Sequence, residues 1–197
     1  MALTELAAVN QMLSAIDEEG VSALGSGIPD AAAAEILLGA VKSDVLAMGW
    51  LVNTRTKTLT KDGNNRFVVA GTALSIDTEG HSAHINVVQR DGYLVDVAND
   101  TDVWPTGSST IRVKIVYDIA FESLPHTLRS YIAARASREF QNDEIGSSNL
   151  EAKISRKETQ LWSAALSDRT LVADENPLRG QGALARGIYR NNRIYGT

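Results

Sequence analysis

The amino-acid sequence predicts an α+β fold: a four-helix bundle, two helices and then two helices, interrupted by a small antiparallel β insertion. Apolar residues recur at helical spacing in residues 1–50 and again in residues 120–173, which we assign to the helical bundle. Between them, in residues 51–119, apolar and polar residues alternate with a period of two, as expected of strands. Two helix pairs around a strand region predict a bundle with an inserted sheet. Residues 174–197 are predicted to form an extended C-terminal tail.

The two N-terminal helices are defined by their end signals. Thr4 is a suitable N-cap for the first helix, whose apolar stripe runs to Ile16. The second helix is predicted to start at Asp30, acting as N-cap after a proline, and to run to Met48. Gly49 is expected to stop it.

The strand region is predicted to be one antiparallel sheet of about six short strands. Two turn sequences divide it, one at residues 61–65 and one at Asp91-Gly92. Asp-Gly between two apolar runs is a strong signal for a two-residue hairpin turn. We therefore expect both turns to be exposed.

The two C-terminal helices are likewise predicted from their end signals and from the spacing of their apolar residues. Leu124-Pro125 begins the third helix, because proline is favoured in a first turn. Its core face repeats every fourth residue, at Leu128, Ile132, Ala136 and Phe140. The fourth helix opens with a capping box at residues 148–151 and its pattern fades between residues 165 and 173.

Composition narrows the class of protein. The 197 residues are 44% hydrophobic and 22% charged, which is typical of a globular chain. The absence of cysteine excludes disulfides and thiolate metal ligands. The N-terminus shows no basic residues followed by an apolar run, so the sequence predicts no signal peptide. No apolar stretch approaches the ~18 residues that a membrane span needs. We expect no membrane association.

The sequence predicts no catalytic residue, no cofactor site and no metal site, and hence no enzyme. His81 and His84 are spaced as H-x-x-H, but in a turn and strand context such side chains point to opposite faces. A metal site there is therefore a minor alternative. The chain contains no G-x-S-x-G elbow, dinucleotide fingerprint or EF-hand.

Charge is unevenly distributed along a chain of net charge −5. Residues 1–50 hold seven carboxylates and a single basic residue, Lys42. After Glu175 no acid follows, while four arginines remain. This asymmetry predicts a tail that binds an acidic surface, with a solvated, dispensable tail as the alternative. The predicted interface residues are Arg179, Arg186, Tyr189, Arg190, Arg193 and Tyr195.

Three segments carry a family resemblance. Residues 113–141 read VKIVYDIAFESLPHTLRSYIAARASREFQ, residues 6–16 read LAAVNQMLSAI, and Gly49-Trp50 follows the second predicted helix. Together they resemble the tail tubular protein A family, the head-to-tail adaptors of short-tailed bacteriophages. The resemblance extends over almost all of residues 1–173, and the tail differs from it.

The resemblance implies a structural virion protein of the phage tail, assembled in the host cytoplasm. Such adaptors form a ring, a dodecamer, beneath the portal protein and above a nozzle similar to tail tubular protein B. Genomic DNA passes through the channel without sequence-specific binding. The alternative is a generic protein- or nucleic-acid-binding module that uses the basic tail, whose tyrosines lie among the arginines.

Overall fold

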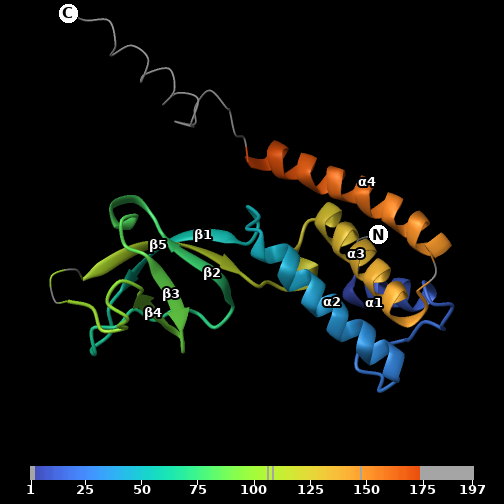
Figure 1. Cartoon of the computed structure of the whole chain (residues 1–197), viewed down its shortest axis with the longest axis horizontal. Helices are drawn as coiled ribbons and strands as arrows, with labels where there is room; N and C mark the ends of the chain where they lie inside the picture. The colour runs from blue at the N-terminus through green and yellow to red at the C-terminus, as the bar shows by residue number, and fades with distance from the viewer. Residues whose placement is uncertain (1–2, 106, 108, 147, 174–197) are drawn as a thin grey trace, which may run out of the picture.

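The computed structural model describes residues 3–105, 107, 109–146 and 148–173, with the side chains of 148–153 and 169–173 left aside. Its helices gather at one end of the molecule and its strands at the other (Figure 1). The helices are α1 (Glu5–Ser14), α2 (Pro29–Ala47), α3 (His126–Glu144) and α4 (Ser148–Ala173). The strands are β1 (Thr54–Thr60), β2 (Ala73–Thr78), β3 (Val87–Arg90), β4 (Tyr93–Asp96) and β5 (Thr110–Tyr117).

The predicted four-helix bundle is wrong. Helices α1, α2 and α3 pack against one another, whereas α4 lies on α3 as an outer layer (Figure 1). Of the α4 side chains that the structure describes, Ala165 is the one that is buried. A helix of a true bundle would bury an apolar stripe along its whole length. Helices α1, α2 and α3 therefore form a three-helix unit, and α4 packs on the surface of this unit.

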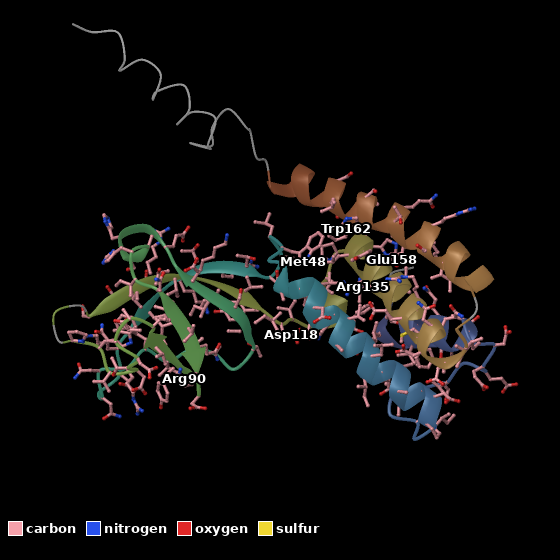
Figure 2. All side chains as sticks on the ribbon, viewed as in Figure 1. Met48, Arg90, Asp118, Arg135, Glu158 and Trp162 are labelled. Atoms are coloured by element: carbon pink, nitrogen blue, oxygen red, sulfur yellow. The ribbon has the colours of Figure 1, made fainter. Side chains whose placement is uncertain are left out.

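Helix α4 is held on α3 by aromatic and ionic contacts. Trp162 and Glu158 project from α4 toward α3 (Figure 2). The ring of Trp162 lies 4.8 Å from that of Tyr131, centroid to centroid. Nε of Arg138 donates to Oε2 of Glu158 at 2.5 Å. These contacts fix α4 although most of its length faces solvent.

The helical core is built from α1, α2 and α3. Met12 and Leu13 of α1 meet Leu38 and Leu46 of α2, and all four are at most 1% exposed. Each large apolar side chain buried in this way contributes about 1.5–3 kcal/mol. The predicted core face of α3 is confirmed, since its four residues are buried: Leu128, Ile132, Ala136 and Phe140.

The strands form two sheets, so the predicted single sheet of about six strands is also wrong. One sheet has three antiparallel strands in the order β1-β5-β2, and the other is the antiparallel pair β3-β4. Residues 67 and 68 make only isolated bridges, Lys61↔Phe67 and Val68↔Tyr93. Residues 103–105 form no strand in the described structure, and Pro105 has no N–H to donate there.

The strand end has a core of its own. Phe67 and Trp104 meet edge to face, with ring centroids 5.3 Å apart, and Trp104 Nε1 donates to the Leu94 carbonyl at 2.9 Å. Around them lie Val87, Val113 and other buried residues of the sheets. This cluster is distinct from the helical core. The chain thus buries two separate hydrophobic cores.

The predicted helix ends are mostly confirmed. Thr4 Oγ1 accepts a hydrogen bond from the Ala7 amide and caps α1. Gly49 ends α2 with φ of +73°, a conformation that favours glycine. Asp30 is not the N-cap, because Pro29 is already helical and Ile28 takes that position. Proline fits the first helical position, where its missing N–H has no partner to lose.

No helix among the described residues is long and apolar enough to cross a membrane.

Candidate interaction surfaces

The six predicted interface residues of the tail, Arg179, Arg186, Tyr189, Arg190, Arg193 and Tyr195, lie outside the described residues. The described chain ends with α4 at Ala173. The surfaces that the structure does place are an apolar face of α2 and a pocket beside the C-terminal half of α4.

Helix α2 is apolar on both of its sides. One side enters the helical core, where Leu38, Val41 and Val45 are at most 1% exposed. The other side faces solvent and centres on Ile36, which is 76% exposed. Around it, one turn away along the helix, lie alanines that are also exposed: Ala32, Ala33 and Ala40. The solvent side of a surface helix usually carries polar and charged residues instead.

Further exposed apolar side chains lie at both ends of α2. Ile28 before the helix is 50% exposed, and Met48 after it is 51% exposed. We call Ile28, Ala32, Ala33, Ile36, Ala40 and Met48 the α2 face. Single exposed apolar residues are ordinary on a monomer, but a row of them along one helix is a candidate surface for binding another protein. The exposed Asp44 lies between Ala40 and Met48 in this row.

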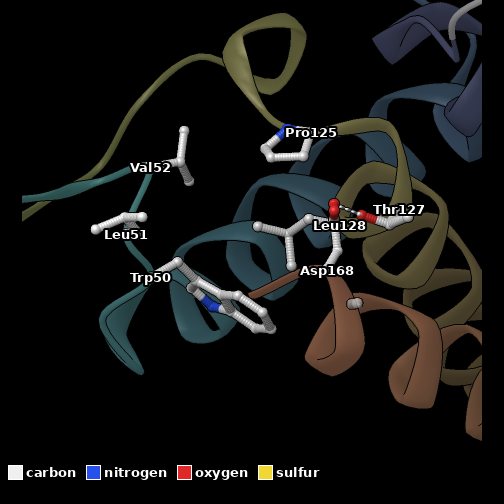
Figure 3. A pocket seen from close by; sticks show the side chains of 8 residues that line it. Trp50, Leu51, Val52, Pro125, Thr127, Leu128 and Asp168 are labelled. Carbon is white, nitrogen blue, oxygen red and sulfur yellow. Dashed lines mark hydrogen bonds between the residues drawn. The ribbon is translucent and has the colours of Figure 1, made fainter. Parts of the chain in front are cut away.

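A pocket of about 250 Å³ opens where the helical end meets the strand end (Figure 3). Its walls come from three parts of the chain: the segment after α2, the start of α3, and α4. They are almost entirely apolar: Trp50, Leu51, Val52, Pro125, Leu128 and Ala165. Asp168 supplies the carboxylate, and its Oδ2 accepts a hydrogen bond from Thr127 Oγ1 at 2.8 Å. We call this site the Trp50 pocket.

Trp50 forms the rigid wall of this pocket. Its side chain is 4% exposed, and Nε1 donates to the Val45 carbonyl at 2.7 Å. Its ring meets Trp162 of α4 edge to face. Trp50 therefore seals the junction between α2 and β1. Because the Val45 carbonyl holds Nε1 of Trp50 and Trp162 packs against its ring, Trp50 is fixed in position as a wall of the pocket.

Asn53 joins the helical end to the strand end. It is 1% exposed, and its Oδ1 accepts from the Trp50 amide at 2.8 Å. Its Nδ2 donates to the Leu46 carbonyl at 3.0 Å and to the Tyr117 carbonyl at 2.8 Å. No prediction from the sequence involved Asn53. The available signal was that asparagine is a preferred turn residue, here just after a helix stop.

Asp118 makes a second contact across the same junction. Its carboxylate accepts from Ser43 Oγ at 3.0 Å and lies 3.0 Å from Nζ of Lys42. Figure 2 shows Asp118 between the helices and the strands. Together with Asn53, it holds α2 against the end of β5.

The outer face of the three-stranded sheet carries both signs of charge. Arg112 and Lys114 lie on β5, and Nε of Arg112 is 3.6 Å from Oε2 of Glu79. Lys114 pairs in register with Asp77 of β2. A mixed face of this kind attracts a phosphate backbone only weakly, because binding to nucleic acid depends on an excess of basic side chains.

His81 and His84 line one pocket, with Asp96 on its wall, so the expectation that they point to opposite faces is wrong. Residues Gly80–Ser82 form a short 3-10 helix, in which the two-residue alternation of a strand does not apply. The hydrogen bond from the Asn99 side chain holds the pKa of the Asp96 carboxyl below its usual range. Within the part of the chain that the structure describes, no group of three or more His, Asp or Glu side chains could hold a metal ion.

Residues 6–172 match the family described as "Tail tubular protein". Among curated proteins, the chain is similar to "Tail tubular protein A" of Klebsiella phage KP34. The two are 24% identical over 166 residues, which cover 84% of this chain and 87% of that protein.

Proposed function

Because the chain belongs to the tail tubular protein family and is thus a structural protein of a phage tail, we propose that it is a head-to-tail adaptor. In this proposal, copies of the chain form a ring between the portal protein and the tail nozzle. The ring lines part of the channel through which DNA leaves the capsid. The alternative of a generic binding module is less well supported, since the family match extends over most of the chain.

The observation that carries this proposal is the α2 face. Ile36, with 76% of its surface exposed, is the most exposed large apolar side chain of the described residues. Burying the row of apolar residues around it against another copy would remove this area from water, which is the main driving force of association. In the proposed ring, a neighbouring subunit would cover the α2 face of each subunit.

The distribution of charge along the chain is a second observation that supports the ring. A closed ring requires two different surfaces on each protomer, because its contacts are head to tail. The carboxylates of residues 1–50 and the four arginines after Glu175 are of opposite sign and far apart in the sequence. Their attraction would steer neighbouring copies into register. Carboxylates facing the channel would also keep DNA mobile.

We further propose that the tail orders on assembly. Arg186, Arg190 and Tyr189 are its preferred contacts, since arginine pairs with carboxylates through two parallel hydrogen bonds and tyrosine offers a large, rigid contact area. Deleting residues 176–197 should leave helix content unchanged by circular dichroism and weaken attachment to the ring or the portal. The loss should shrink at high salt. A truncated protein that builds infectious particles normally would contradict this.

The strand region, residues 51–119, is proposed to act as a unit inserted between the helical segments 1–50 and 120–173. Its own hydrophobic core, around Phe67 and Trp104, supports this division. In the assembled tail we expect part of this unit to meet another tail protein. Val68, 57% exposed, and Val88, 42% exposed, are available for such a contact.

The adaptor role is tested by removing the gene from the phage that encodes it. We expect DNA-filled heads that lack tails, and recovery of infectivity when purified protein is added to those heads. The matched control is addition of the Ile36→Glu variant, which should not restore infectivity. Heads that still carry complete tails without the protein would contradict the proposal.

A further inference from the structure

We infer that the Trp50 pocket is the receptor for the C-terminal segment, residues 176–197, of a neighbouring copy of the chain. This inference rests on the proposed ring, because it needs a second copy. It identifies which part of the folded chain the tail binds.

The pocket has the chemistry of a site for one apolar anchor beside one cation. Its volume of about 250 Å³ exceeds the roughly 150 Å³ that holds a benzene ring in an apolar protein cavity. Its rim is open, since Leu51 is 50% exposed. Asp168 is the charged residue on its wall, and the hydrogen bond from Thr127 orients the carboxylate there. A segment that places an apolar side chain next to an arginine fits both features.

The C-terminal segment has this composition. It contains four arginines and no carboxylate side chain, and its apolar residues lie close to those arginines. Ile188 and Tyr189 stand directly between Arg186 and Arg190, and Ile194 follows Arg193. An aliphatic or aromatic side chain in the pocket would therefore bring a guanidinium within reach of Asp168. Arginine binds a carboxylate through two parallel hydrogen bonds, which gives the contact a defined orientation.

The sequence next to the end of α4 favours a neighbouring copy over the chain's own tail. Asp174 and Glu175 follow the helix immediately, only six residues after Asp168. A tight reversal of the chain would bring these carboxylates toward the carboxylate of Asp168, and like charges repel. The 22 residues from 176 to 197 can span up to roughly 75 Å when extended, which is ample for reaching an adjacent protomer.

Disulfide trapping in the full-length protein tests the inference, because the chain has no cysteine of its own. One variant carries Leu51→Cys at the pocket rim. A second carries one tail cysteine, at Leu184, Ile188 or Ile194 in turn, together with a size tag. The two are mixed, oxidised and separated on a non-reducing gel. A product of the mixed size contains two different chains by construction, and we expect it for at least one tail position.

The matched control is Val103→Cys in place of Leu51→Cys. Val103 is 51% exposed and lies on the strand end, away from the pocket. It should give no mixed product above background. A double variant with Leu51→Cys and the reactive tail cysteine in one chain reports on intramolecular docking. A cross-link within one chain, equal trapping at Val103, or no mixed product would each overturn the inference.

Asp168 gives a second readout. Asp168→Asn should lower the yield of mixed product about two- to fivefold at low salt, the range expected for one partly exposed ion pair. Asp91→Asn, which removes an exposed carboxylate from the β3–β4 turn, should leave the yield unchanged. Equal yields from the wild type and Asp168→Asn would show that no ion pair between Asp168 and a tail arginine contributes to docking. Rings seen by electron microscopy without any cross-link would refute the docking and leave the adaptor proposal standing.

Discussion

Trp162 of α4 meets Trp50 of the α2–β1 connection edge to face, with ring centroids 5.8 Å apart and ring planes at 85°. Such an edge-to-face pair contributes about 0.5–1.5 kcal/mol beyond the area that it buries. The pair links the outermost helix to the junction between the two ends of the molecule. Trp50 of this pair also lines the Trp50 pocket.

Replacing Trp162 with alanine should therefore loosen α4. We expect the free energy of unfolding to fall by about 2–4 kcal/mol, somewhat less than for a fully buried tryptophan because Trp162 is only partly buried. Urea unfolding followed by circular dichroism measures this. Trp162→Phe keeps an aromatic ring and should cost less than half as much. If alanine and phenylalanine behave alike, the aromatic pair does not hold the helix.

Asn53→Ala should destabilise the junction. The substitution leaves the Trp50 amide and the carbonyls of Leu46 and Tyr117 without their side-chain partner. The Leu46 carbonyl still accepts from the Gly49 amide, so the cost comes from the two other lost hydrogen bonds. At about 1–3 kcal/mol each, a total loss of about 2–6 kcal/mol is expected in chemical denaturation. The control is Asn64→Ala in an exposed turn. A loss below about 0.5 kcal/mol at Asn53, the usual range for a surface change, would refute the role assigned to it.

Gly92→Val should strain the β3–β4 hairpin. Asp91 and Gly92 have φ of +52° and +80°, as a two-residue turn of this type requires, so the predicted hairpin is confirmed. No atom lies within 4 Å of a Cβ added at Gly92, so the cost of about 1–3 kcal/mol comes from the backbone alone. Gly63→Val, also in open space but outside the positive-φ region, is the control. Equal melting temperatures for both variants would reject the assignment.

Ile36→Glu should prevent self-association without unfolding the chain. Ile36 is 76% exposed, so a charge there costs little in the monomer but would be desolvated in an interface. Light scattering should show a lower mass for this variant at an unchanged melting temperature. Val103→Glu, placed at a valine of the strand end that is 51% exposed, should assemble normally. Normal assembly of the Ile36 variant would exclude the α2 face from the interface.

Local signals in the sequence predicted the local structure well. Thr4, Gly49 and Asp91-Gly92 act through hydrogen bonds and φ angles within a few residues, so their roles follow from residue type and spacing. The predicted core face of α3 was correct for the same reason, because helical periodicity alone determines which residues share a face.

Long-range arrangements could not be predicted in this way. Alternation identified β1 and β5 as strands, but not that β5 would lie between β1 and β2, which are far earlier in the chain. The place of α4 depends on Trp162 reaching Tyr131 and Trp50, and four amphipathic helices do not by themselves specify a bundle. Asn53 was missed because its partners, Leu46 and Tyr117, come together only in the folded chain.

The most direct test of the adaptor account is the mass of the assembled protein, measured by mass photometry and imaged by electron microscopy, alone and after mixing with purified portal rings. The account predicts a closed ring of about twelve chains, free or seated on the portal. The comparison with portal matters because some ring proteins assemble only on their template. A protein that stays monomeric at high concentration and does not bind portal rings would contradict it.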